Sequence, residues 1–272
     1  MKGSKAQQLN ELRQALDDAR SKHGHEAPEV VPHLIALGDY YLHVRDYSMA
    51  EEAFSYALHI VERSEPTAEL NGTQLLGRIG KTQLTNAEHL RSSPQPGAEA
   101  NTEFSRGIQT LERASVLAEQ IYGKGSDEYC DSLLNLGLAW ASGNRPEQAK
   151  PYLKRCIQRY DTTHASQKLD CALNLMADCL LAGGETMKAV PLLERSISIC
   201  ITMHGSDHLT TGMAMDRLAE ALKLVGRHSE VLNLDRSVLA IFEKHLPCDD
   251  HRLVAVKSRL TASPATDRPA QA

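Results

Sequence analysis

Six polar residues between positions 135 and 220 of the sequence stand at related positions and could hold part of a polypeptide. An asparagine amide carries two donors and one acceptor, so a row of asparagines can bind the main chain of an extended peptide whatever its side chains are. Carboxylates with an arginine among them favour a bound segment of some basic character. The alternative is that such residues are solvated, or paired with one another along a helix. The six candidates are Asn135, Asn174, Asp178, Asp216, Arg217 and Glu220.

The positions of these residues are set by a pattern of small and apolar residues that recurs five times. The first copy begins at Leu37-Gly38 and has Ala50 thirteen residues after its leucine, and the third begins at Leu136 and has Ala149 at the same distance. The leading position falls at residues 37, 76, 136, 176 and 218, which gives steps of 39, 60, 40 and 42 residues. The pattern resembles the tetratricopeptide repeat, in which a helix A and a helix B lock together through small residues.

The subtype of the repeat resembles that of the kinesin light chains and their relatives. The signs are a period near 42 residues, the junction His204-Gly-Ser-Asp-His208, and tetrapeptides in helix B such as Leu193-Glu-Arg-Ser. The resemblance implies that the A helices line a concave groove for other proteins. It also implies that asparagines in this groove hold the bound peptide, and Asn135 and Asn174 fall near the matching positions.

The second copy contains an insertion. Its helix B resumes only at Gly107, 31 residues after Leu76 rather than 13, so about 18 residues are added. An insertion of this length is several times longer than one helical turn of roughly 3.6 residues. The stretch Ser92–Ala98 contains two prolines and a glycine, which break helices. We therefore expect an insert loop at about residues 86–103 in repeat two.

These observations predict an all-α fold, a right-handed superhelix (α-solenoid) of about five helix pairs with a half-repeat at each end. Residues 1–24 are expected to form an N-terminal capping helix, residues 25–261 the solenoid, and residues 262–272 a disordered tail, because that tail is rich in Pro, Ala and Thr. Gly24, Gly123 and Gly205 each stand where a helix B should end, so we expect them in the left-handed conformation.

Four arginines share one position in successive B helices. We expect them to form ion pairs between repeats on the outer face, since acidic residues stand nearby, although stacked arginines could also bind an anionic ligand. They are Arg113, Arg155, Arg195 and Arg236.

Composition excludes several classes of function. The formal net charge of −5 and the sequence pI near 6.2 argue against a nucleic-acid-binding protein, which would be strongly basic. None of the six cysteines forms a C-x-x-C pair, so we expect neither a metal site nor a redox site. There is no secretory signal core at the N-terminus and no apolar run of the roughly 18 residues that a membrane span needs, so the expected location is cytoplasmic.

The function expected from the sequence is that of a non-catalytic adaptor that binds an extended peptide segment of another protein in the concave groove. No nucleophile elbow, P-loop or dinucleotide-binding turn is present, and no cofactor is expected. One alternative is a structural scaffold or self-associating component that uses the convex face or the end helices. Another is a regulator whose superhelix tightens around a small ligand. The partner and the oligomeric state are left open.

Overall fold

The computed structural model describes residues 2–64, 72–93, 97–163 and 166–262. Within these ranges the chain forms twelve α-helices and one short 3-10 helix, with no strand, so the predicted all-α fold is confirmed. None of these helices is long and apolar enough to cross a membrane. The chain divides into two compact units, Met1–Gly143 and Asn144–Ala272, which we call the N-terminal and C-terminal units and describe separately.

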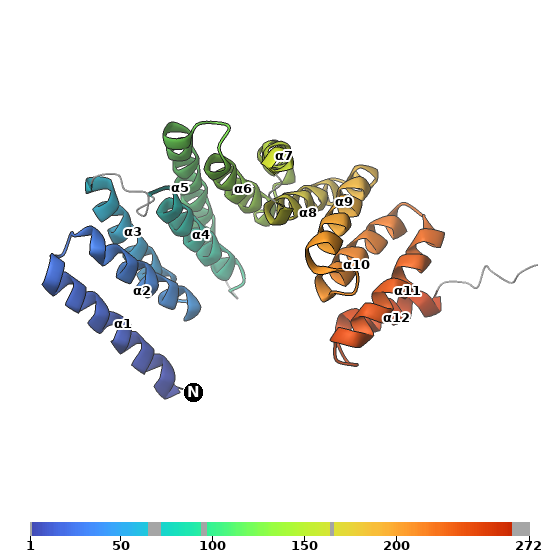
Figure 1. Ribbon diagram of the computed structural model, residues 1–272, viewed down its shortest axis with the longest axis horizontal. Coiled ribbons are helices and arrows are strands. Elements are labelled where there is room, and N and C mark those ends of the chain that lie inside the picture. Colours follow the sequence, from blue (N-terminus) through green and yellow to red (C-terminus); the bar gives the residue numbers. More distant parts are fainter. Residues whose placement is uncertain (1, 65–71, 94–96, 164–165, 263–272) are drawn as a thin grey trace, which may run out of the picture. The chain divides into compact units, whose positions relative to one another are not determined.

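In the N-terminal unit, consecutive helices pack side by side along the chain (Figure 1). By the register of the repeats, α2, α4 and α6 are A helices, and α3 and α5 are B helices. The elements are α1 (Lys2–His23), the 3-10 helix η1 (Pro28–Val30), α2 (Val31–His43), α3 (Tyr47–Arg63), α4 (Gly72–Arg91), α5 (Ala98–Tyr122) and α6 (Asp127–Ser142).

The C-terminal unit has the same arrangement of neighbouring helices (Figure 1). Its A helices are α8 and α10, its B helices are α7, α9 and α11, and α12 follows the last pair. The elements are α7 (Pro146–Thr163), α8 (Ser166–Ala182), α9 (Thr186–His204), α10 (Leu209–Leu224), α11 (His228–His245) and α12 (His251–Ala262).

Local sequence signals explain where the helices begin and end. The carboxylate of Asp46 accepts a hydrogen bond from the Met49 N–H at 3.2 Å and caps the start of α3. At the ends of α1, α5 and α9, the glycines Gly24, Gly123 and Gly205 have φ angles of 98°, 82° and 96°. Glycine adopts positive φ without a steric penalty, so this part of the prediction is confirmed, but ψ is 161° at Gly123 and 162° at Gly205, which is extended and not left-handed helical.

The core of each unit lies between the helices of a pair and between neighbouring pairs. In the first pair, α2 approaches α3 so closely that a Cβ atom at Gly38 would lie 2.5 Å from Cε1 of Phe54. Phe54 is fully buried. The Leu-Gly signature of the repeat therefore marks a contact in which the aromatic ring fills the space that any other side chain would occupy.

The predicted insert loop at residues 86–103 is largely wrong. Helix α4 continues to Arg91 and α5 begins at Ala98, so most of the inserted residues lengthen the two helices of the pair. The pair is held closely, because a Cβ at Gly80 would lie 2.7 Å from Leu111 and one at Gly107 would lie 2.8 Å from Leu84. The tail predicted to be disordered lies outside the described residues, except for Ala262, which ends α12.

Among the B-helix arginines, Arg113 and Arg195 form the predicted ion pairs between repeats. Arg113 of α5 pairs with Glu62 of α3, and Arg195 of α9 pairs with Asp161 of α7. Each arginine reaches an acid on the preceding B helix rather than the acid beside it in the sequence. These pairs are exposed and each contributes at most about 1 kcal/mol.

The ion pairs of Glu185 indicate how the stability of the C-terminal unit depends on pH. Glu185, which precedes α9, accepts hydrogen bonds from Lys150 of α7 at 2.7 Å and from Lys188 at 2.5 Å. These bonds lower the pKa of Glu185 from its ordinary 4.5 to about 2. A carboxyl group whose pKa falls on folding stabilises the native state above its unfolded pKa, and this contribution is lost as the pH falls from about 4.5 to 2.

We therefore expect the free energy of unfolding of Glu185→Gln to fall less steeply than that of the wild type between about pH 5 and pH 2. This range is set by the unfolded and folded pKa values of Glu185. Urea unfolding followed by circular dichroism at several pH values measures this. The control is Glu194→Gln, which removes an exposed carboxylate from within α9. Equal flattening in both variants would contradict the assignment to Glu185.

Candidate binding sites on the A helices

Two of the six predicted site residues pair with each other. Arg217 of α10 donates to the Asp178 carboxylate of α8. The same contact between successive A helices occurs in the N-terminal unit, where Arg78 of α4 donates to Asp39 of α2. These side chains are about half exposed, so a ligand could reach them, but each charge already has a partner.

Two further predicted residues, Asp216 and Glu220, form ion pairs with an arginine of α12. Arg259 donates to both of their carboxylates and also to Asp235 of α11, with its Nη2 at 2.7 Å from Asp235 Oδ1. Asp235 is buried, and the Arg259 side chain is 11% exposed. One guanidinium thus joins three carboxylates from two helices to the end helix.

Electrostatics accounts for the charged state of this cluster. Burial by itself lowers the pKa of Arg259, but the hydrogen bonds from its guanidinium to Asp235 and Asp216 outweigh this effect and raise the pKa above its ordinary value. Arg259 is therefore a permanent cation at the position where the sequence suggested a site for a basic partner segment.

Asn174 uses its amide donors within its own repeat. Its Nδ2 donates to the Asp170 carbonyl at 2.9 Å, to Asp170 Oδ1 at 3.0 Å and to Ser196 Oγ of α9 at 3.0 Å. The Ser196 hydroxyl in turn donates to Asp170 Oδ1 at 2.5 Å and is buried. This network fixes α8 against α9, and it leaves mainly the Oδ1 acceptor of Asn174 for a ligand.

Asn135 lies in a different environment. It projects from α6 into a polar cavity of about 300 Å³ between α4 and α6, with its Nδ2 at 3.6 Å from the Cβ position of Gly77. In the described part of the chain the Asn135 amide has no hydrogen-bond partner. The same cavity is lined by Gln74 of α4 and by Glu128 and Ser132 of α6, so amide, carboxylate and hydroxyl groups converge on it.

The sequence of the chain matches known repeat families. Two models of the tetratricopeptide-repeat family match it, one over residues 131–163 and one over residues 168–244, which together extend from α6 to α11. The chain contains tetratricopeptide repeats. No curated protein matches it significantly.

Solved structures place the fold of this tetratricopeptide-repeat protein near that of kinesin-light-chain-like repeats. BtubC (BKLC) of P. vanneervenii is 13% identical with a TM-score of 0.67, and 98% of this chain and 96% of that chain are covered. A Podospora anserina protein described as a kinesin light chain with nearly identical TPR-like repeats is 17% identical with a TM-score of 0.63, covering 80% and 96%. An assembly chaperone of RpL4 (Acl4) is 15% identical with a TM-score of 0.52, covering 95% of each chain.

Sequence reasoning missed the role of Arg259 in this tetratricopeptide-repeat protein, although a signal for it exists. Three ion pairs join an A helix to the next A helix or to α12, and the two residues of each pair are 39 positions apart. They are Asp39–Arg78, Asp178–Arg217 and Glu220–Arg259. That spacing lies close to the period of the repeats, so an acid followed by an arginine one period later indicates a bridge between consecutive repeats.

Proposed function

We propose that this tetratricopeptide-repeat protein is a non-catalytic adaptor that binds an extended segment of another protein along its A helices. The observation that carries the proposal is the Asn135 amide, which faces a polar cavity and lacks a hydrogen-bond partner in the described part of the chain. A free amide can give one donor and one acceptor to the main chain of a bound segment, which is how an extended peptide is held independently of its side chains.

The other residues expected at the site take secondary roles in this proposal. Asn174 would accept one N–H through its Oδ1, because its donors are used inside the repeat. The Asp178–Arg217 pair is accessible enough to exchange with a charged side chain of the partner. Asp216 and Glu220 would contribute least to peptide binding, because both carboxylates are already paired with Arg259.

The wider context supports an interaction role. One structural neighbour is described as an assembly chaperone of RpL4, so its described role is to act on another protein.

The cysteines bear on the location of the protein. All six are present as thiols, and four of them are buried, which suits a reducing compartment. We propose a cytoplasmic location on this ground.

The test is selection of a proteome-derived peptide library displayed on phage, run in parallel on the wild-type protein and on Asn135→Ala. We expect the selected peptides to bind the variant roughly tenfold more weakly, because one hydrogen-bonding amide is worth about 1 kcal/mol and leaves unpaired groups behind. The melting temperature should stay unchanged, since the Asn135 amide makes no hydrogen bond within the described residues.

The matched control is Asn101→Ala, which removes an exposed amide from the B helix α5 of the same unit. Peptides that bind wild type, Asn135→Ala and Asn101→Ala with the same affinity would show that the cavity between α4 and α6 is not the site. Selection of no peptide at all would count against recognition of extended segments.

A further inference from the structure

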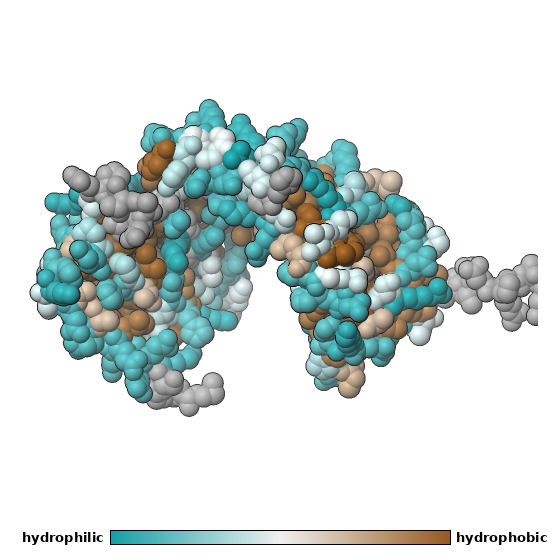
Figure 2. All heavy atoms as spheres, in the orientation of Figure 1, coloured by the Kyte–Doolittle hydropathy of each residue, from teal (hydrophilic) through white to brown (hydrophobic). Residues whose placement is uncertain are grey.

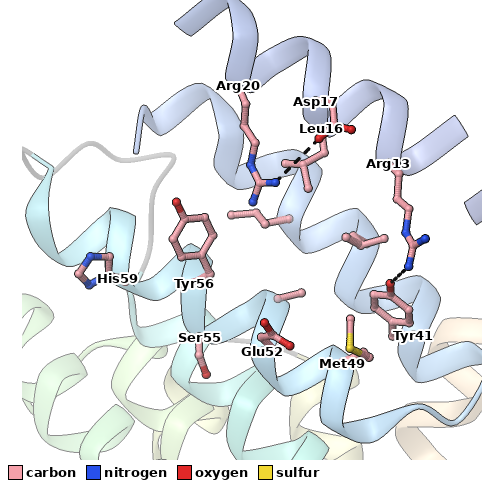
Figure 3. Close-up of a pocket in the computed structure, with 13 residues that line it drawn as sticks. Arg13, Leu16, Asp17, Arg20, Tyr41, Met49, Glu52, Ser55, Tyr56 and His59 are labelled. Atoms are coloured by element: carbon pink, nitrogen blue, oxygen red, sulfur yellow. Dashed lines mark hydrogen bonds and ion pairs between the residues drawn. The ribbon is translucent and has the colours of Figure 1, made fainter. Parts of the chain in front are cut away.

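The N-terminal unit contains a second, larger cavity that the repeat pattern does not predict. It has a volume of about 690 Å³ and lies between α1 and α3, with residues of α2 at its base (Figure 3). This volume is within the range of roughly 300–1,000 Å³ that is typical of binding cavities. We call it the α1–α3 groove. It shares no residue with the cavity around Asn135.

The base of the α1–α3 groove is apolar. Leu16 of α1, Leu34 and Leu37 of α2, and Ala53 of α3 line it, and all four belong to the buried core. In the space-filling view, hydrophobic residues are visible among hydrophilic ones over the first helices of this unit (Figure 2). A ligand side chain that enters the groove would therefore meet aliphatic groups and gain hydrophobic contact.

The α1 wall of the groove carries two guanidinium groups that have no hydrogen-bonded carboxylate among the residues that the structure describes. Arg13 Nη2 donates to the Tyr41 hydroxyl, a neutral group, at 3.0 Å. The Arg20 guanidinium lies 5.6 Å from the centre of the Tyr56 ring, and its Nε is buried without a hydrogen-bond partner in the described residues. Its nearest acid is Asp17 at 3.9 Å, beyond hydrogen-bonding distance (Figure 3). Two charge-assisted donors at the edge of an apolar cavity are suited to bind carboxylates.

The spacing of these arginines matches a helix. Arg13 and Arg20 are seven residues apart on α1, about 10 Å or two helical turns. A second helix lying along α1 has the same rise, so carboxylates at positions i and i+7 would meet both arginines. The residues at i+3 and i+4 of that helix would then face Leu16 and the apolar base, which is the usual way in which an amphipathic helix binds a groove.

We propose that the α1–α3 groove binds an amphipathic helix of a partner protein whose two apolar anchors are flanked by carboxylates two turns apart. The acids of the groove itself set the orientation. Asp17 stands between the two arginines, but its side chain is 68% exposed and lies at the rim. Glu52 lies on the opposite wall formed by α3 and favours a basic residue on the other edge of the bound helix.

The probe for the test is a hydrocarbon-stapled helical peptide of about 18 residues, long enough to be stably helical once stapled. It has glutamates at its fifth and twelfth positions and leucines at its eighth and ninth positions, on an alanine and glutamine background. Two companion peptides carry glutamine or lysine in place of both glutamates. We expect fluorescence anisotropy to rank the affinities as glutamate, then glutamine, then lysine, with roughly tenfold between the first two.

The protein variants locate the contact. Arg13→Gln with Arg20→Gln should weaken the glutamate peptide roughly tenfold and bring it to the level of the glutamine peptide. Arg13→Glu with Arg20→Glu should reverse the order, so that the lysine peptide binds best. The control is Lys5→Gln with Lys22→Gln, which removes the same charge from exposed positions of α1 that do not line the groove. Melting curves confirm that each variant is folded.

Several results would overturn the proposal. Equal binding of all three peptides would mean that only the apolar base is recognised, and loss of binding in the lysine control would mean a general effect of charge. Absence of binding by the glutamate peptide at millimolar concentration would rule out the assigned partner. A second copy of the chain would be the occupant if sedimentation shows a concentration-dependent dimer that the paired arginine-to-glutamine variant abolishes. None of these results depends on whether Asn135→Ala affects peptide binding.

Discussion

Replacing Arg259 with methionine is expected to lower the free energy of unfolding of the C-terminal unit by about 3–5 kcal/mol, the usual cost of removing one partner of a buried ion pair. Arg259 holds the buried carboxylate of Asp235 through hydrogen bonds at 2.7 and 3.1 Å, and it also pairs with Asp216 and Glu220. Methionine keeps much of the apolar volume of the side chain, so the loss comes from leaving the Asp235 charge uncompensated.

The effect can be separated from a general loss of packing. Hydrogen exchange read by mass spectrometry should show faster exchange in α10, α11 and α12 of the Arg259→Met variant, while Arg236→Met, an exposed arginine of α11, should leave the pattern unchanged. Adding Asp235→Leu to Arg259→Met should recover most of the lost stability, because the pair of buried charges is then gone. If the double variant is no more stable than Arg259→Met, the explanation by an unpaired carboxylate is wrong.

The second large effect is expected for Gly38→Ala in the N-terminal unit, a loss of about 1–3 kcal/mol from overpacking. The new Cβ would lie 2.5 Å from Cε1 of Phe54, and this ring is fully buried and has little room to move. Alanine stabilises a helix by about 0.5–1 kcal/mol relative to glycine. The measured destabilisation is therefore the steric cost minus this gain.

Gly77 provides the matched comparison, because it occupies the same repeat position in α4. Among the described residues, a Cβ there would meet only Asn135 Nδ2, at the ordinary contact distance of 3.6 Å. Gly77→Ala is therefore expected to stabilise the unit by about 0.5–1 kcal/mol, through helix propensity alone. The chain has a single tryptophan, Trp140 in α6, so its fluorescence during urea unfolding follows the N-terminal unit in both variants. Opposite signs for the two substitutions are expected, and equal signs would contradict the assigned packing.

The fold was largely predictable because the signals that specify it are local and repeated. The small residues that lock the pairs, such as Gly38 and Ala50, recur at fixed offsets, and glycines with positive φ mark the ends of helices such as α5 and α9. The insertion in the second pair was harder. Counting offsets gives the number of added residues, whereas their conformation depends on composition: residues on both sides of the Pro-Gly cluster are compatible with a helix, so α4 and α5 extend towards it.

The candidate site was less predictable, because a polar residue's position on a helix does not say which neighbour it pairs with. Asn135 and Asn174 stand at similar positions, yet only Asn174 has a serine within 3.0 Å on the next helix. Likewise, the sequence does not reveal that Asp216 and Glu220 are paired and so less accessible to a ligand. Their partner, Arg259, lies about 40 residues later, on a helix outside the five recognised copies. The α1–α3 groove was missed for a related reason: no repeated pattern marks the surface where an end helix meets the first pair.

The spacing of the bridges between repeats bears on how such a chain can grow. Helix α10 carries Arg217, which reaches back to Asp178, and Glu220, which reaches forward to Arg259. A segment of one period therefore contains both a charge for the repeat before it and an opposite charge for the repeat after it. Duplication of that segment would add a complete bridge, whereas a deletion that removes Arg217 but keeps Asp178 would leave the Asp178 carboxylate without its arginine. Gain or loss of one whole period at α10 thus keeps every acid of these bridges matched with an arginine.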